Sequence, residues 1–198
     1  LPASSTWPGG IPPEVIAAGD TPAGKAEGIV ATEVGQGVSV MLRSSDPFAR
    51  WEQASVIRGA GKGTVSAVAY AALGDITASQ FQSLANIQRE LGADVRLSNR
   101  QNVVFRGLQE EQLRTLFDRL EAIGMARPGA ELARDVVACP GADTCNIAVT
   151  QSRGLAKAIG ERLEEEGLAE VGGVRINISG CTNSCGQHHA SDIGLFGA

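Results

Sequence analysis

Four cysteines near the end of the chain constrain its fold more than any other feature: Cys139, Cys145, Cys181 and Cys185. They form two tight pairs with the spacings C-x5-C and C-x3-C, and the 198 residues contain no further cysteine. Turn-forming residues fill the first pair, and Gly141, Gly180 and Gly186 flank the cysteines. Glycines let the backbone approach closely and aim N–H groups at sulfur. Two such segments meeting at one point would supply the four thiolates of a 4Fe-4S cluster.

Two other interpretations of the cysteines stay open. The first is that the cysteines form disulfides or are inert buried thiols. Disulfide frameworks belong mostly to small secreted domains that lack a core, whereas 43% of this chain is hydrophobic, enough to form one. A structural zinc site with the same four thiolates is the other. Zinc usually takes C-x2-4-C knuckles, and C-x5-C is wider than that. The spacing therefore favours the cluster.

Composition and charge narrow the class of protein. The net charge is −5 and the basic residues are scattered, which argues against a nucleic-acid surface. No apolar run approaches the length of about 20 residues that crosses a bilayer, so we expect no membrane partner. The chain begins at Leu1 without an initiator methionine or a signal pattern. We expect a segment of a longer protein, located in the cytoplasm.

The pattern of hydrophobic residues predicts three parts. Residues 1–48 are rich in Pro, Gly, Ala and Ser, with one apolar run at 38–42, and predict a linker or peripheral wrap. Residues 49–127 predict the order β-α-β-β-α, in which Thr77 and Gln80 form a capping box and Gly92 ends the first helix. This order is typical of an α+β, ferredoxin-like half-domain.

Residues 128–198 predict an α/β domain that carries the cysteines. A short strand at 136–138 leads into the first pair, and a strand at 174–178 leads into the second. Between them we expect a helix at 150–166 with an inward stripe of Leu155, Ile159 and Leu163, and after them a closing strand at 193–196.

Several sequence blocks resemble the sirohaem and 4Fe-4S segment of the nitrite and sulfite reductase family. They are residues 138–146, 152–156, 178–189 and 192–194. Two upstream blocks, 74–80 and 95–102, resemble the ferredoxin-like half-domain of the same family. The resemblance covers roughly residues 48–198, and the blocks occur in the family's order. We therefore expect a ferredoxin-like half-domain followed by a sirohaem/4Fe-4S-binding domain.

The resemblance implies cofactors and residue roles. In the family, the thiolate of the last cysteine, here Cys185, bridges the cluster and the sirohaem iron. Asn183 matches a position that hydrogen-bonds sirohaem carboxylates. Arg96, Arg100, Gln101 and Arg153 are further candidates for the same carboxylates, although an exposed arginine is often merely solvated. His188 and His189 follow the cluster motif, where they would shuttle protons or provide polar support.

The resemblance also implies an activity that this chain does not complete alone. Family members reduce nitrite to ammonia or sulfite to sulfide with six electrons, fed by ferredoxin or a flavoprotein. They combine two related halves, and the chain resembles the second, C-terminal half. The catalytic residues that grip the oxyanion lie chiefly in the other half, so we expect the missing half as a partner and an inactive fragment. The alternative is a non-catalytic 4Fe-4S electron-transfer module.

Overall fold

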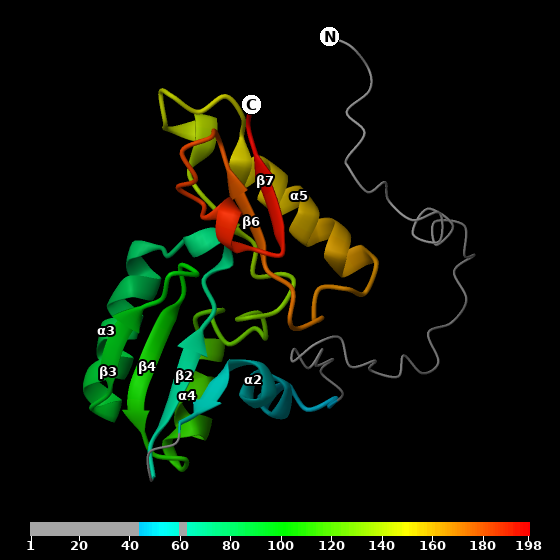
Figure 1. Ribbon diagram of the computed structural model, residues 1–198. Coiled ribbons are helices and arrows are strands. Elements are labelled where there is room, and N and C mark those ends of the chain that lie inside the picture. Colours follow the sequence, from blue (N-terminus) through cyan, green and yellow to red (C-terminus); the bar gives the residue numbers. More distant parts are fainter. Residues whose placement is uncertain (1–43, 60–62) are drawn as a thin grey trace. The chain divides into compact units, whose positions relative to one another are not determined.

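A computed structural model describes residues 44–59 and 63–198 of the chain (Figure 1). The expected apolar run at 38–42, and almost all of the expected linker at 1–48, lie outside the described residues. No helix within the two described stretches is long and apolar enough to cross a membrane.

The first part of the described chain is an antiparallel sheet with helices packed on it. Its strands follow the spatial order β1-β2-β4-β3. The elements are α2 (Pro47–Ser55), β1 (Val56–Arg58), β2 (Val65–Ala69), η2 (Ala72–Gly74), α3 (Ala78–Leu91), β3 (Asp94–Leu97), β4 (Val103–Leu108) and α4 (Gln112–Glu121). From β2 to α4 the order is β-α-β-β-α, which confirms the expected α+β fold class.

Local signals in the sequence explain where the helices begin and end. The carboxylate of Asp46 accepts a hydrogen bond from the N–H of Ala49 at 3.1 Å and caps α2. Thr77 and Gln80 form the expected capping box of α3, with distances of 3.2 and 3.0 Å. Gly92 ends α3 in the left-handed conformation, with φ of 63°.

One hydrophobic core lies between this sheet and its helices. Alternate residues of β2 and β4 face it, and helix α4 contributes the inner face that the helical spacing of Leu113, Leu116, Leu120 and Ile123 predicts. The largest fully buried members are Trp51, Phe105, Leu108, Leu113, Leu116, Leu120 and Met125. Figure 1 shows α3 and α4 on the same side of the strands. Every second side chain of the strands and one stripe of side chains on α4 therefore point into the same hydrophobic layer.

The second part of the described chain is a small parallel sheet covered by one long helix. Its three strands follow the order β5-β6-β7. Its elements are β5 (Val137–Ala138), η3 (Gly141–Asp143), α5 (Ser152–Glu165), β6 (Ile176–Ser179), η4 (His188–Ala190) and β7 (Ile193–Phe196). A second, smaller core joins α5 to the sheet through Val136, Ala138, Ala156, Ile176 and Ile178. The expected closing strand is thus confirmed as β7.

Three details of the expected pattern are wrong. Strand β1 was not expected; it has three residues, too few for a clear alternation. Leu155 was expected to face inward on α5, yet it is 46% exposed, and its neighbour Ala156 is buried instead. A small side chain at that position lets α5 approach the sheet. The helical spacing of Phe81 with Leu84, Ile87 and Leu91 predicts one inner face of α3, yet Phe81 is 62% exposed.

A buried polar cluster joins the two parts around Asp135. Its carboxylate accepts hydrogen bonds from Arg100 Nε at 2.8 Å and from Asn102 Nδ2 at 3.0 Å. The side-chain oxygen of Asn102 accepts from the N–H of Ala71. All described residues fall in one compact unit, and the boundary expected near residue 128 stays a prediction.

Candidate metal centre

The two cysteine segments begin at the same edge of the parallel sheet. Cys139 directly follows β5, and Cys181 follows β6 after Gly180. These strands are neighbours, with Ala138 opposite Ile178, and the N–H of Cys139 donates to the carbonyl of Ile178 at 3.1 Å. Carboxyl ends of neighbouring parallel strands point the same way. The sheet therefore delivers one cysteine of each pair to one place.

Hydrogen bonds favour the thiolate form of Cys139. The thiol is buried, and the N–H of Gly180 donates to its sulfur at 3.1 Å, while the hydroxyl of Ser152 lies 3.4 Å from it. Burial raises the pKa of Cys139, but the hydrogen bonds from Ser152 and from the backbone of Gly180 and Gly141 outweigh burial, so the pKa lies below its ordinary value. The thiolate is the form that binds metal.

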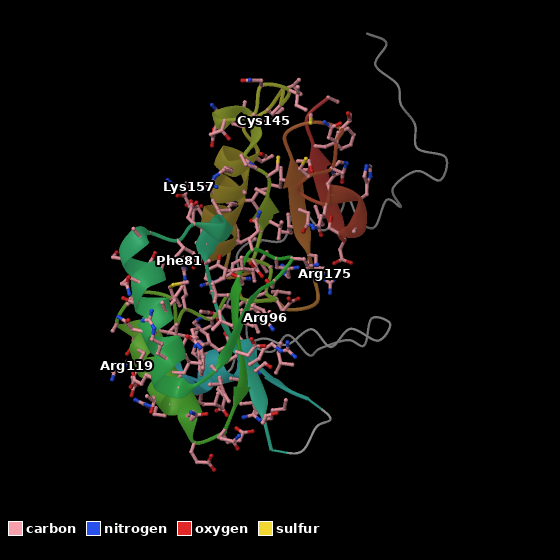
Figure 2. All side chains as sticks on the ribbon, turned by 90° about the vertical axis from the view of Figure 1, so that its left-hand side faces the viewer. Phe81, Arg96, Arg119, Cys145, Lys157 and Arg175 are labelled. Atoms are coloured by element: carbon pink, nitrogen blue, oxygen red, sulfur yellow. The ribbon has the colours of Figure 1, made fainter. Side chains whose placement is uncertain are left out.

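The loop of the first cysteine pair packs on the start of the second. The N–H groups of Val149 and Thr150 donate to the carbonyl of Gly180 at 2.8 and 3.2 Å. A Cβ atom at Gly180 would lie 2.8 Å from the Cα of Gly141, so the two backbones pass closely where both residues are glycine. Cys145, in this loop, is half-buried and labelled in Figure 2.

The second pair lies on a tight turn. The N–H of Gln187 donates to the carbonyl of Ser184 at 2.8 Å, and both residues have a positive φ, 58° and 59°. Cys181 is half-buried and Cys185 is exposed, as is Asn183 between them. The turn thus presents the last cysteine of the set outward.

All four cysteines are free thiols. Within residues 44–59 and 63–198, no three His, Cys, Asp or Glu side chains are gathered closely enough to hold a metal ion. The structure thus brings the two cysteine segments together through their backbones and does not bring the four sulfur atoms around one centre. The two segments still fit an iron–sulfur cluster, because they supply four soft sulfur donors and the sulfur of Cys139 already accepts a backbone N–H. Gly180 also lies where a Cβ atom would collide with the backbone of Gly141.

The other predicted site residues differ in what their side chains contact. Gln101 donates from its amide to the carbonyl of Ala138, next to Cys139, at 3.1 Å. Arg153 begins α5 and pairs with Asp75. Arg100 is buried and bound to Asp135, so its guanidinium is already paired. Arg96 lies on the edge strand β3 (Figure 2), and its side chain is 60% exposed.

The two histidines have different surroundings. His188 is buried and stacks on Phe196, with ring centroids 4.8 Å apart, whereas His189 is exposed. Burial and the neighbouring His189 lower the pKa of His188 below its ordinary value. The His188 ring is therefore neutral at neutral pH.

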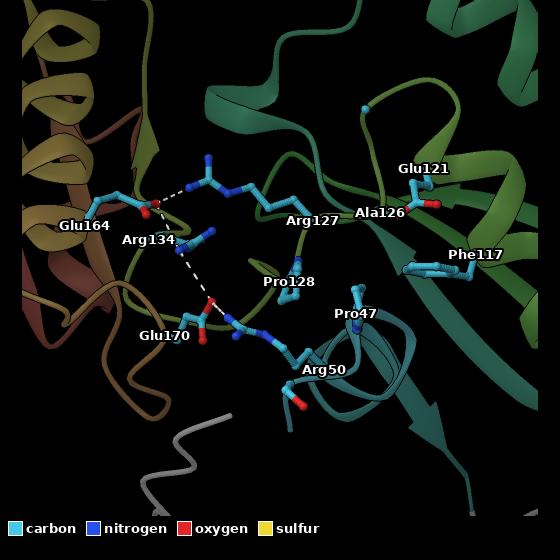
Figure 3. A pocket seen from close by; sticks show the side chains of 12 residues that line it. Pro47, Arg50, Phe117, Glu121, Ala126, Arg127, Pro128, Arg134, Glu164 and Glu170 are labelled. Atoms are coloured by element: carbon cyan, nitrogen blue, oxygen red, sulfur yellow. Dashed lines mark hydrogen bonds and ion pairs between the residues drawn. The ribbon is translucent and has the colours of Figure 1, made fainter. Parts of the chain in front are cut away.

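A pocket of about 460 Å³ lies elsewhere and is lined by ion pairs (Figure 3). Arg134 lies 2.9 Å from Glu164 and 3.8 Å from Glu170. Arg127 pairs with Glu164, and Arg50 pairs with Glu170. Each of the three arginines thus contacts a carboxylate, but they share two, Glu164 and Glu170. No cysteine is among the described lining residues of this pocket.

Three residues that the sequence did not single out contribute to the centre. Ser152 is fully buried, and its hydroxyl lies 2.7 Å from the carbonyl oxygen of Cys139, which is the alternative acceptor for its single proton. Ser179 is buried beside the second pair, and Asp135 binds Arg100 behind the first. Both serines lie inside the family-like blocks 152–156 and 178–189, one at a helix start and one at a strand end next to the cysteines, but the blocks alone assign them no role.

Comparisons with known proteins agree with this geometry. Residues 58–123 match the family described as the nitrite/sulfite reductase ferredoxin-like half domain, and residues 129–198 match the nitrite and sulphite reductase 4Fe-4S domain. The chain belongs to the nitrite/sulfite reductase family of oxidoreductases, whose members carry a 4Fe-4S cluster and sirohaem.

The individual relatives are longer than this chain. It is 37% identical over 127 residues to the ferredoxin–nitrite reductase of Synechococcus elongatus, covering 64% of this chain and 25% of the relative. It is 28% identical over 130 residues to sulfite reductase [ferredoxin] 2 of Mycolicibacterium paratuberculosis, covering 63% and 23%. The structure of Mycobacterium tuberculosis NirA superposes with a TM-score of 0.59 at 25% identity, covering 71% of this chain and 27% of that one. The chain spans about a quarter of the length of these relatives.

Proposed function

We propose that this chain is the C-terminal part of a sirohaem- and 4Fe-4S-dependent nitrite or sulfite reductase. The observation that carries the proposal is the backbone contact between the two cysteine segments at the ends of β5 and β6, inside the matched 4Fe-4S domain. Nitrite would take up six electrons and eight protons to give ammonium and two waters. Hydrogen sulfite would take up six electrons and six protons to give hydrogen sulfide anion and three waters. When bound, the two cofactors supply stored electrons beside an open iron coordination site.

The cysteines of this chain would hold the cluster. Cys139 is the preorganised member, because Gly180 and Ser152 already surround its sulfur. Cys185 is exposed on the outer side of its turn, which suits a thiolate shared with the sirohaem iron. Asn183 is exposed on the same turn and would hydrogen-bond the sirohaem carboxylates.

Four further residues remain candidates for those carboxylates. Arg96 is exposed, Gln101 lies beside the first cysteine segment, and Arg153 pairs with Asp75. The guanidinium of Arg100 already binds the side chain and the carbonyl of Asp135. A sirohaem role for Arg100 would require it to leave this buried pair, and we propose that it acts mainly as structural support.

The missing N-terminal half of the same enzyme would complete the site. The chain spans about a quarter of its relatives, and each arginine of its ion-paired pocket already contacts Glu164 or Glu170. An apolar groove along α3 and β3, with exposed Phe81 and Leu97, leaves hydrophobic surface for such a partner. We propose ferredoxin as the electron donor, a flavoprotein being the alternative, because several relatives are named ferredoxin-dependent. The cytoplasm is the compartment we propose.

Replacing each cysteine by alanine tests the ligand set. We expect the chain reconstituted without oxygen to bind about four irons and four sulfides, and each single Cys→Ala variant to lose that stoichiometry, because a cubane needs four protein ligands. The matched control is Thr182→Ala, an exposed change between Cys181 and Asn183. A Cys→Ala variant with full iron and sulfide content would remove that cysteine from the set.

Turnover by the full-length protein tests the reaction. With chemically reduced ferredoxin, we expect the full-length enzyme to form ammonium from nitrite or sulfide from sulfite, and this chain alone to form neither. The ratio of kcat/KM for the two oxyanions then identifies the substrate. A cluster-loaded full-length protein that reduces neither oxyanion would favour an electron-transfer module.

A further inference from the structure

We infer that Ser179 and His188 form a hydrogen-bonded clasp that holds the Cys181–Cys185 turn closed, and that both are positioning residues for two of the cluster ligands. The inference rests on the proposed function in that it takes Cys181 and Cys185 as ligands. The clasp itself is a property of the chain. Ser179 is 1% exposed and His188 is 6% exposed, so both side chains lie where water does not replace their contacts.

The first half of the clasp joins the two ends of the turn. Ser179 stands two residues before Cys181, and Gly186 stands one residue after Cys185. The N–H of Gly186 donates to the hydroxyl oxygen of Ser179 at 3.1 Å. This bond closes a loop that contains both cysteines of the second pair, so it limits how far their sulfur atoms can separate.

The second half of the clasp anchors that hydroxyl. His188 Nδ1 lies 2.8 Å from Ser179 Oγ. Because Gly186 already donates to this oxygen, the single proton of the hydroxyl is free to be donated to Nδ1 of the neutral ring. In the described part of the chain, Nε2 of His188 has no hydrogen-bond partner. Ser179 is therefore the polar anchor of the ring.

Contacts with the sheet fix the position of the imidazole independently of the cysteines. The ring stacks on Phe196 of β7, with an interplanar angle of 19°. The carbonyl of His188 accepts from the hydroxyl of Ser191 at 2.9 Å, and Asn177 of β6 donates to the carbonyl of Gln187 at 3.2 Å. Figure 1 shows η4, which begins at His188, against β6 and β7. Because the sheet holds the imidazole ring, the clasp fixes the turn relative to the sheet, although the cysteines of the turn are partly exposed.

A simple packing role for His188 is the competing explanation, and three substitutions separate the two. His188→Leu keeps an apolar side chain beside Phe196 but removes the hydrogen bond. His188→Asn places an amide where Nδ1 lies and keeps the bond. Ser179→Ala removes both bonds of the clasp. Thr182→Ala, at an exposed position of the same turn, is the matched control.

Two readouts test the clasp, and one of them needs no cluster. Amide exchange of Gly186 in the metal-free chain is expected to accelerate about 5-fold in Ser179→Ala and about 3-fold in His188→Leu, as the loss of a buried hydrogen bond implies. Iron loss to a chelator from the reconstituted chain is expected to accelerate by similar factors. His188→Asn and Thr182→Ala should stay within about 2-fold of the unchanged chain in both readouts.

The outcomes distinguish this inference from the proposed function. If the unchanged chain assembles no cluster, the ligand assignment fails, while the exchange of Gly186 still decides whether the clasp exists. Equal exchange in His188→Leu and the unchanged chain would overturn the clasp. Equal acceleration in His188→Leu and His188→Asn would show that the ring acts by packing, which also overturns it.

Discussion

Gly186→Ala is expected to prevent cluster assembly and to lower the free energy of unfolding by about 3 kcal/mol or more. A Cβ atom at residue 186 would lie 2.8 Å from the carbonyl carbon of Ile178 and closer still to its oxygen. Both are backbone atoms of the central strand β6, so neither can move aside as a side-chain end would. The turn would have to open, and Cys185 would move with it. Denaturant unfolding and iron content measure the two effects.

Gly160→Ala is the matched control for this substitution. Gly160 lies inside α5, and a Cβ atom there would meet nothing within 4 Å. We expect this variant to bind iron normally and to be more stable by roughly 0.5 to 1 kcal/mol, since alanine favours helix. If Gly186→Ala left the free energy of unfolding as high as Gly160→Ala does, the result would contradict the close passage of the turn over β6.

Asp135→Ala is expected to lower the free energy of unfolding by about 3–5 kcal/mol, because it removes the nearest partner of a buried charge and leaves Arg100 only its longer, 3.6 Å ion pair with Glu131. Arg100, only 7% exposed, binds Asp135 through Nε at 2.8 Å and through its terminal nitrogen to the carbonyl at 2.7 Å. Asn102 and the N–H of Glu131 also donate to this carboxylate. Denaturant unfolding of the full chain gives the change directly.

An exposed carboxylate provides the comparison for Asp135. Asp94 pairs with Arg96 and Arg106 on the sheet surface, where its side chain is 46% exposed. Asp94→Ala should cost less than about 1 kcal/mol, because water screens exposed ion pairs. Equal effects of the two substitutions would show that Arg100 finds another partner or reaches water.

Much of the fold follows from local sequence signals. The capping box of Thr77 and Gln80 and the left-handed Gly92 act within a few residues, and both ends of α3 agree with the expectation. The parallel pairing of β6 with β7 was not specified, because the strands are joined by the cysteine turn and not by a helix. Strand β1 is stabilised by pairing with β2, a contact that its three residues do not encode alone.

The predicted inward-facing residues were wrong where packing, and not the spacing of hydrophobic residues, decides which side chain is buried. On α5, leucine at 155 fits the stripe as well as its neighbours, yet close approach of the helix to the sheet selects Ala156. The spacing of hydrophobic residues along a helix does not show which of its positions lies closest to the neighbouring sheet. The exposed Phe81 is a similar case, since it lines a groove beside β3 rather than the core.

The cysteine spacing predicted the candidate centre, but the polar residues around it could not be predicted. Ser152 is 13 residues from Cys139, and Asp135 is 35 residues from Arg100. Such pairs depend on which segments the fold brings together. Arg100 illustrates the limit, because an arginine in a family motif suggests a cofactor contact, while the fold buries it against a carboxylate. The roles of the other candidate residues stay predictions.

Iron and acid-labile sulfide analysis of this chain, purified without oxygen and combined with its visible spectrum, tests the central claim most directly. The proposed site predicts a brown protein with about four irons and four sulfides per chain. A colourless protein that cannot be reconstituted with iron and sulfide, but binds one zinc tightly through its thiolates, would contradict the claim and indicate a structural zinc site.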